Sequence, residues 1–79
     1  MAHKFNIGDK VRINAQGAAY WGDYGVGPDD NDNPTNDVGT VFEIINNFWL
    51  GLTTRVRWSN GVTNSYHDED LNLVMRVVK

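Results

Sequence analysis

Cysteine is absent from this chain of 79 residues. Its absence excludes disulfides, thiolate metal sites and a cysteine nucleophile. No run approaches the roughly 18 apolar residues that a membrane-spanning helix needs, and the first residues lack the apolar core of a secretion signal. These absences favour a soluble, cytoplasmic protein with no membrane partner.

Positive charge is also scarce, since seven Lys and Arg stand against ten Asp and Glu, a net charge of -3 at pH 7. This balance opposes the electrostatic attraction behind most nucleic-acid binding and argues against a nucleic-acid partner. A chain this short buries only about 60% of its unfolded surface. We therefore expect residues 1–79 to form a single small domain without a large enclosed active site.

The residue patterns that are present predict short strands. Alternating or β-branched runs fall at 10–13, 38–45, 54–58, 62–66 and 73–78. Asn60-Gly61 predicts a type I′ hairpin turn, because both central positions of that turn need positive φ. Residues 67–70 predict a 3₁₀ turn capped by Asp68. The expected fold is all-β: a small five-stranded SH3-like barrel with a long first loop and a short 3₁₀ turn before the last strand.

The long first loop covers residues 14–37 and is rich in Gly, Asp and Asn, which favour turns. Loops of this length in compact domains are usually functional or disordered. Tyr20, Trp21 and Tyr24 predict an ordered first half, whereas PDDNDNP contains nothing apolar and predicts a mobile second half.

The acidic part of this loop, with Asp29, Asp30 and Asp32, invites a calcium hypothesis because hard cations take several oxygen ligands. An EF-hand loop starting at Asp29 would need Gly at its sixth position and Glu at its twelfth, where this chain has Pro34 and Thr40. The template fails. We interpret the segment as a solvated turn and expect no metal or other cofactor.

The sequence contains one group of residues that could suggest a catalytic site: His67 with Asp68, Glu69 and Asp70, and Ser65 close by. Neighbouring strand residues point to opposite faces, so Asp68 would not share the face of Ser65 and His67. No phosphate-cradling glycine loop is present either. The sequence therefore indicates a noncatalytic protein.

Aromatic residues give the best binding candidates, because aromatic clefts hold extended or proline-rich peptides. The candidates lie in the first loop and in the loop 46–53: Tyr20, Trp21, Tyr24, Phe48 and Trp49. Trp58 is expected in the core. Arg55 and Arg57 share the outward face of their strand, where they would either be solvated or pair with a partner's carboxylates.

Several motifs together resemble the Mind bomb and Herc type domain, an SH3-like module of large ubiquitin ligases. They are GDKV at 8–11, WGD at 21–23, VGTV at 38–41, VRWSNGVTNSY at 56–66 and Asp70-Leu71. The resemblance implies a noncatalytic module that holds short peptide segments. The chain departs from the family in the short HDED that links TNSY to its final strand, and in starting with its own Met1, which suggests a stand-alone version.

The leading hypothesis is thus a protein or peptide binding module that docks a partner between the two aromatic loops. Three alternatives remain open. The first is an acidic inhibitor, viral or microbial, that blocks a host site with Asp29, Asp30 and Asp32. The second is a nucleic-acid-binding barrel with Lys10, Arg12, Arg55 and Arg57 as its basic patch. The third is a homo-oligomer that packs its aromatic loop on its own copy.

Overall fold

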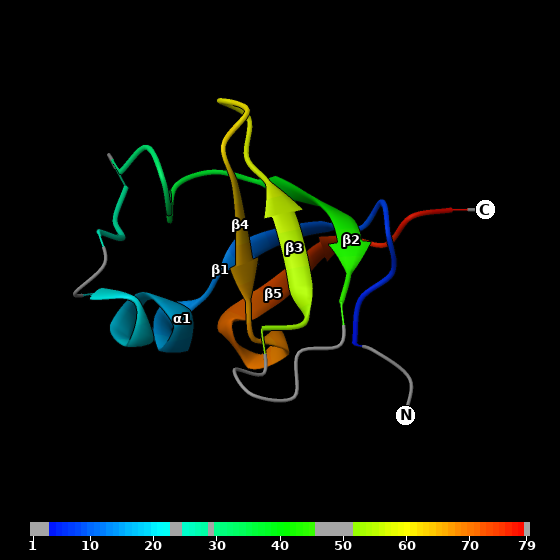
Figure 1. Cartoon of the computed structure of the whole chain (residues 1–79), viewed down its shortest axis with the longest axis horizontal. Coiled ribbons are helices and arrows are strands. Elements are labelled where there is room, and N and C mark those ends of the chain that lie inside the picture. The colour runs from blue at the N-terminus through cyan, green and yellow to red at the C-terminus, as the bar shows by residue number, and fades with distance from the viewer. Residues whose placement is uncertain (1–3, 23–24, 29, 46–51, 79) are drawn as a thin grey trace.

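Five strands form one antiparallel sheet in the computed structural model, which describes residues 4–22, 25–28, 30–45 and 52–78 (Figure 1). The strands are β1 (Lys10–Ile13), β2 (Gly39–Ile44), β3 (Thr54–Arg57), β4 (Thr63–Tyr66) and β5 (Leu71–Met75). Their order is β4-β3-β2-β1-β5, so β4 and β5 are the two edges of the described sheet. The prediction of an all-β fold with five short strands is confirmed.

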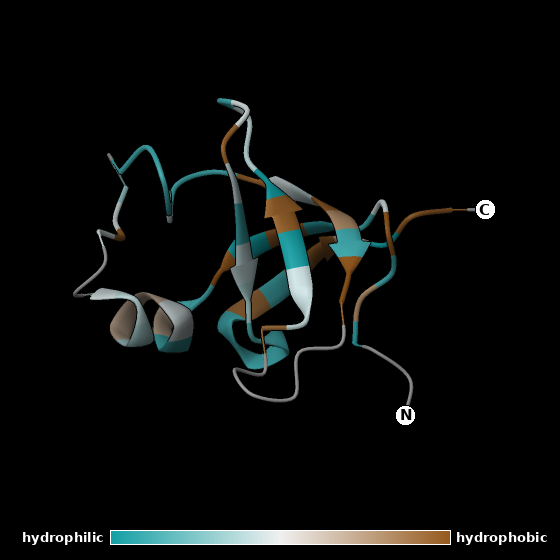
Figure 2. Cartoon of the chain, viewed as in Figure 1, coloured by the Kyte–Doolittle hydropathy of each residue, from teal (hydrophilic) through white to brown (hydrophobic). Residues whose placement is uncertain are grey.

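One core lies on the inner face of this sheet. In β1, β2 and β3 the fully buried Val11, Val41 and Val56 lie between exposed or half-exposed neighbours, as expected for alternating strand residues. Figure 2 shows the resulting brown and teal bands along the strands. Trp58 is only 1% exposed and packs in this core with Tyr66, which confirms its predicted position.

The predicted long loop 14–37 contains a short helix, α1 (Ala15–Tyr20), which the sequence did not predict. The Asn14 side chain accepts a hydrogen bond from the Gly17 N–H at 2.8 Å and caps the helix. A Cβ on Gly17 would lie 2.5 Å from the Asp70 carbonyl oxygen, so glycine lets α1 pack against the 3₁₀ turn η2 (Asp68–Asp70). No described helix is long and apolar enough to cross a bilayer.

The hairpin between β3 and β4 differs from the predicted type I′ turn. Among the described residues only glycines have positive φ, and Gly61, at +89°, is the one in this turn. The Gly61 N–H donates to the Trp58 carbonyl, and the Trp58 N–H donates to the Val62 carbonyl. This is a three-residue loop, in which an ordinary turn is followed by a left-handed glycine. Asn60 therefore needs no positive φ.

The last strand covers 71–75, earlier than the predicted 73–78. It starts at Leu71, which pairs with Ile13 of β1. The strand ends before Val77 because the Val77 N–H donates to the Asp9 carboxylate at 2.8 Å instead of to a neighbouring strand.

Candidate functional site

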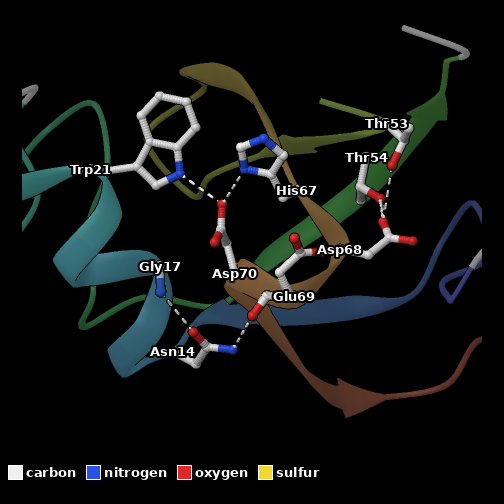
Figure 3. Close-up of polar contacts among 9 residues, drawn as sticks. All are labelled: Asn14, Gly17, Trp21, Thr53, Thr54, His67, Asp68, Glu69 and Asp70. Atoms are coloured by element: carbon white, nitrogen blue, oxygen red, sulfur yellow. Dashed lines mark hydrogen bonds and ion pairs between the residues drawn. The ribbon is translucent and has the colours of Figure 1, made fainter. Parts of the chain in front are cut away.

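Trp21 lies where the end of α1 meets the end of β4. Its half-buried indole donates Nε1–H to Asp70 Oδ2 at 3.0 Å. The ring stacks with His67 at a centroid distance of 6.2 Å and meets the Tyr66 ring edge-on at 6.0 Å. Figure 3 shows the indole and the imidazole converging on the Asp70 carboxylate. These contacts fix the orientation of Trp21.

Two carboxylates of η2 connect this turn to other elements. Asp70 is 1% exposed and its Oδ2 also lies 3.0 Å from His67 Nδ1. Asp68 accepts hydrogen bonds from the hydroxyls of Thr53 and Thr54 (Figure 3). His67, not Asp68, stands at the N-cap of η2, so the predicted capping role of Asp68 is wrong. Asp68 instead holds η2 against the start of β3.

Tyr20 is the exposed member of the aromatic cluster, with 56% of its surface open to solvent. Its ring meets Trp21 edge-on at 4.9 Å and His67 at 5.0 Å. The other predicted aromatic contacts, Tyr24, Phe48 and Trp49, lie outside the described residues. A groove between the two aromatic loops therefore stays a prediction.

The acidic segment is packed against the β3–β4 hairpin, contrary to the expectation of a mobile stretch. Asp30 Oδ1 accepts the N–H groups of Asp32 and Asn33 at 2.8 and 2.7 Å and so forms a tight turn. The Asn60 and Asn64 side chains donate to the carbonyls of Asn31 and Asp32. Asp29 lies outside the described residues. Among those that are described, no three His, Cys, Asp or Glu side chains gather as a metal site.

Tyr66 connects this segment to the core. Its buried hydroxyl donates to Asn33 Oδ1 at 2.6 Å and accepts from Trp58 Nε1 at 2.9 Å. Burial disfavours the phenolate and raises the pKa of Tyr66 to about 12. The hydroxyl is thus a permanent donor at physiological pH.

The outer edge of β4 carries backbone groups that the sheet does not use. In an antiparallel pair of strands, hydrogen-bonded and non-hydrogen-bonded residue pairs alternate. Trp58 and Val62 form a hydrogen-bonded pair, so the next pair, Arg57 with Thr63, is not hydrogen-bonded. The same holds for Arg55 with Ser65. The N–H and C=O groups of Thr63 and Ser65 therefore point away from β3. No described residue forms a backbone hydrogen bond to these groups from the other side.

An open groove of about 640 Å³ follows this edge. Thr63 and Ser65 line it from β4, and its other walls include Trp21, Leu52, Asp32 and Asn33. The groove thus joins a predicted aromatic residue, Trp21, and a predicted acidic residue, Asp32, beside the outer edge of β4. The backbone groups of β4 repeat along the groove, so the groove suits an extended peptide better than a small-molecule substrate.

No family model, curated protein or solved structure matches this chain.

Arg55 and Arg57 do not line the groove. Arg55 forms an ion pair with Glu43, with Nη1 to Oε1 at 2.7 Å, across the β2–β3 pair. The guanidinium carbons of Arg55 and Arg57 lie 5.1 and 4.8 Å from the centroid of the Phe42 ring. The predicted outward placement is confirmed by the buried Val56 between them, and half-exposed Phe42 is an aromatic partner that the sequence analysis missed.

Leu52, Thr63 and Ser65 were also missed as site residues. Nothing in TNSY separates an edge strand from a central one, because strand order depends on pairings between residues far apart in the sequence. Their side chains are small or ordinary, and the groove uses the backbone of β4.

Proposed function

We propose that this chain is a noncatalytic module that binds an extended peptide segment of a partner protein. The observation that carries the proposal is the outer edge of β4, where no described residue bonds the outward backbone groups of Thr63 and Ser65. This edge lies beside the groove of Trp21 and Leu52. A peptide added as a further strand would gain main-chain hydrogen bonds from β4 and side-chain contacts from the groove.

The finer description of the fold belongs to the same proposal. A small SH3-like barrel requires the first strand to pair with both the second and the last, and the order β4-β3-β2-β1-β5 supports it. Contacts among the motif residues support the resemblance to the Mind bomb and Herc type domain. Gly39 packs against Trp58, and Asp70 accepts a hydrogen bond that orients Trp21. We infer a peptide-binding relative of such domains.

A proline substitution tests this site directly. The Ser65 N–H points outward, so Ser65→Pro removes a donor for the added strand without breaking a bond to β3, and proline is tolerated on such edges. Peptides selected from a displayed random library should bind the parent and lose about tenfold or more in affinity on Ser65→Pro, as measured by fluorescence anisotropy. Ser65→Ala, which keeps the N–H, should bind like the parent.

Two further measurements keep this test decisive. Thermal unfolding of Ser65→Pro shows whether the fold is retained, and Leu52→Ala removes a wall of the groove without touching the edge. Selected peptides that bind equally well to Ser65→Pro and Leu52→Ala, or a library that yields no binder, would refute the proposed site.

A further inference from the structure

We propose that the occupant of the β4 groove is a cationic segment, with a Lys or Arg two residues away from an apolar residue. This inference rests on the proposed function and adds the chemical class of the peptide. Two independent observations carry it: the charge of the groove, and the spacing of its acidic and aromatic ends along β4.

The first observation is that the groove is acidic. Asp32 is exposed, and its carboxylate has no hydrogen-bond or ion-pair partner among the described residues. The described residues that line the groove include no Lys or Arg. Residues 13–54 contain no Lys, Arg or His at all, whereas they contain six acidic residues: Asp23, Asp29, Asp30, Asp32, Asp37 and Glu43. A cation that enters the groove therefore meets no competing positive charge in its walls.

The second observation is the distance between the two ends. The Asn64 side chain donates to the Asp32 carbonyl at 2.7 Å, which places Asp32 beside Asn64. Trp21 lies beside Tyr66, two residues further along β4. Two residues of a strand span about 7 Å, and side chains two apart share a face. A peptide strand paired with β4 has the same period. One of its side chains would therefore meet Asp32, and the side chain two residues away would meet Trp21.

The chemistry of each end selects its side chain. The Asp32 carboxylate accepts hydrogen bonds from an ammonium or guanidinium group, and such charge-assisted bonds are stronger than neutral ones. The Trp21 ring and Leu52 offer apolar contact area to an aliphatic or proline side chain. An anionic segment would be repelled by the Asp32 carboxylate, and a uniformly polar segment would bury no apolar area against Trp21 and Leu52.

The test is the sequence bias of the selected peptides. In the sequences selected from the displayed random library, the position two residues away from an apolar residue should hold Lys or Arg more often than Asp or Glu. Replacing that Lys in a synthetic consensus peptide by norleucine should weaken binding by about three- to tenfold, and replacing it by Glu should weaken it further. The preference should shrink between about 20 and 300 mM salt, since exposed charges are screened.

Matched variants of the protein locate the effect. Asp32→Asn removes the charge of a carboxylate that forms no hydrogen bond or ion pair with the described residues, and it should abolish the preference for Lys over norleucine. Glu69→Gln removes an exposed carboxylate that does not line the groove, and it should leave the preference unchanged.

The outcomes separate this inference from the proposed function. Peptides that bind without a charge preference but still fail on Ser65→Pro would overturn the cationic class and leave the groove intact. A Lys preference that survives Asp32→Asn, or that Glu69→Gln removes equally, would overturn the role of Asp32. If no peptide is selected, both the proposed function and this inference fail.

Discussion

Tyr66 is the residue that joins the acidic segment to the core. Its ring is fully buried, and burying a hydroxyl without partners would be costly. Here the single hydrogen is donated to Asn33 and a lone pair accepts the Trp58 indole N–H, so the group is satisfied. One phenol oxygen thus fixes both the core tryptophan and the wall of the groove.

Tyr66→Phe should lower the free energy of unfolding by about 1–3 kcal/mol, because it leaves Asn33 Oδ1 and Trp58 Nε1 without this partner. Urea denaturation followed by tryptophan fluorescence measures the loss. Tyr20→Phe is the matched control, since the Tyr20 ring is exposed and its contacts are through the ring alone. Equal stability of the two variants would contradict a structural role for the Tyr66 hydroxyl.

At the scale of elements, the side chains of Val56 and Trp58 pack over the backbone of β2 where Gly39 has no side chain. A Cβ at this position would lie 2.3 Å from Val56 Cγ1 and 2.7 Å from Trp58 Cε3. Such distances are far inside van der Waals contact, so either the tryptophan or the strand must move. The glycine therefore decides how deeply Trp58 sits in the core.

Gly39→Ala should destabilise the protein by about 1–3 kcal/mol through this overlap and shift the Trp58 emission. Gly27→Ala provides the control, because a Cβ there meets nothing within 4 Å and the backbone needs no positive φ. Thermal and urea unfolding of both variants would measure the difference. Similar small effects at the two positions would mean that β2 relaxes around the methyl group without cost.

At the scale of the whole molecule, Asp9 ties the two ends of the described chain together. Its carboxylate accepts the N–H groups of Asn6 and Val77 at 2.8 Å each and pairs with Arg76 Nη1 at 2.7 Å. Arg76 also donates to the Lys4 carbonyl. Burial raises the pKa of Asp9, but the two backbone hydrogen bonds and the charge of Arg76 outweigh burial and leave the pKa lower than 3.8.

Acid titration tests this connection. Because the folded pKa of Asp9 lies lower than its unfolded value, its contribution to stability is present above about pH 4 and is lost as the pH falls through the folded pKa. Asp9→Asn should therefore be less stable at neutral pH and lose less stability than the parent between about pH 5 and 2. Circular dichroism during urea unfolding at several pH values measures both effects.

Glu69→Gln serves as the control for that titration, since Glu69 is exposed. It should keep the acid dependence of the parent protein. The role of Asp9 would be rejected if Asp9→Asn and the parent lost stability in parallel as the pH falls.

The sequence by itself determined the strands and the core. Alternation around Val11 and Val56 has the same period as a strand, and the clustering of turn residues marks where the chain reverses. These signals are local, so the five strands, the buried Trp58 and the outward arginines could all be predicted. The prediction of a type I′ turn failed because the loop is one residue longer than the Asn-Gly pair suggests, and of the three loop residues 59–61 it is Gly61 that takes positive φ.

The tertiary structure decided where the candidate site lies. The edge position of β4 follows from pairings between distant segments, which no short motif encodes. The helix α1 depends on Gly17 fitting against Asp70, and the acidic segment is held by Tyr66, Asn60 and Asn64 from the hairpin. Local sequence therefore specifies the parts, while long-range hydrogen bonds and close packing bring Trp21 and Asp32 to one groove.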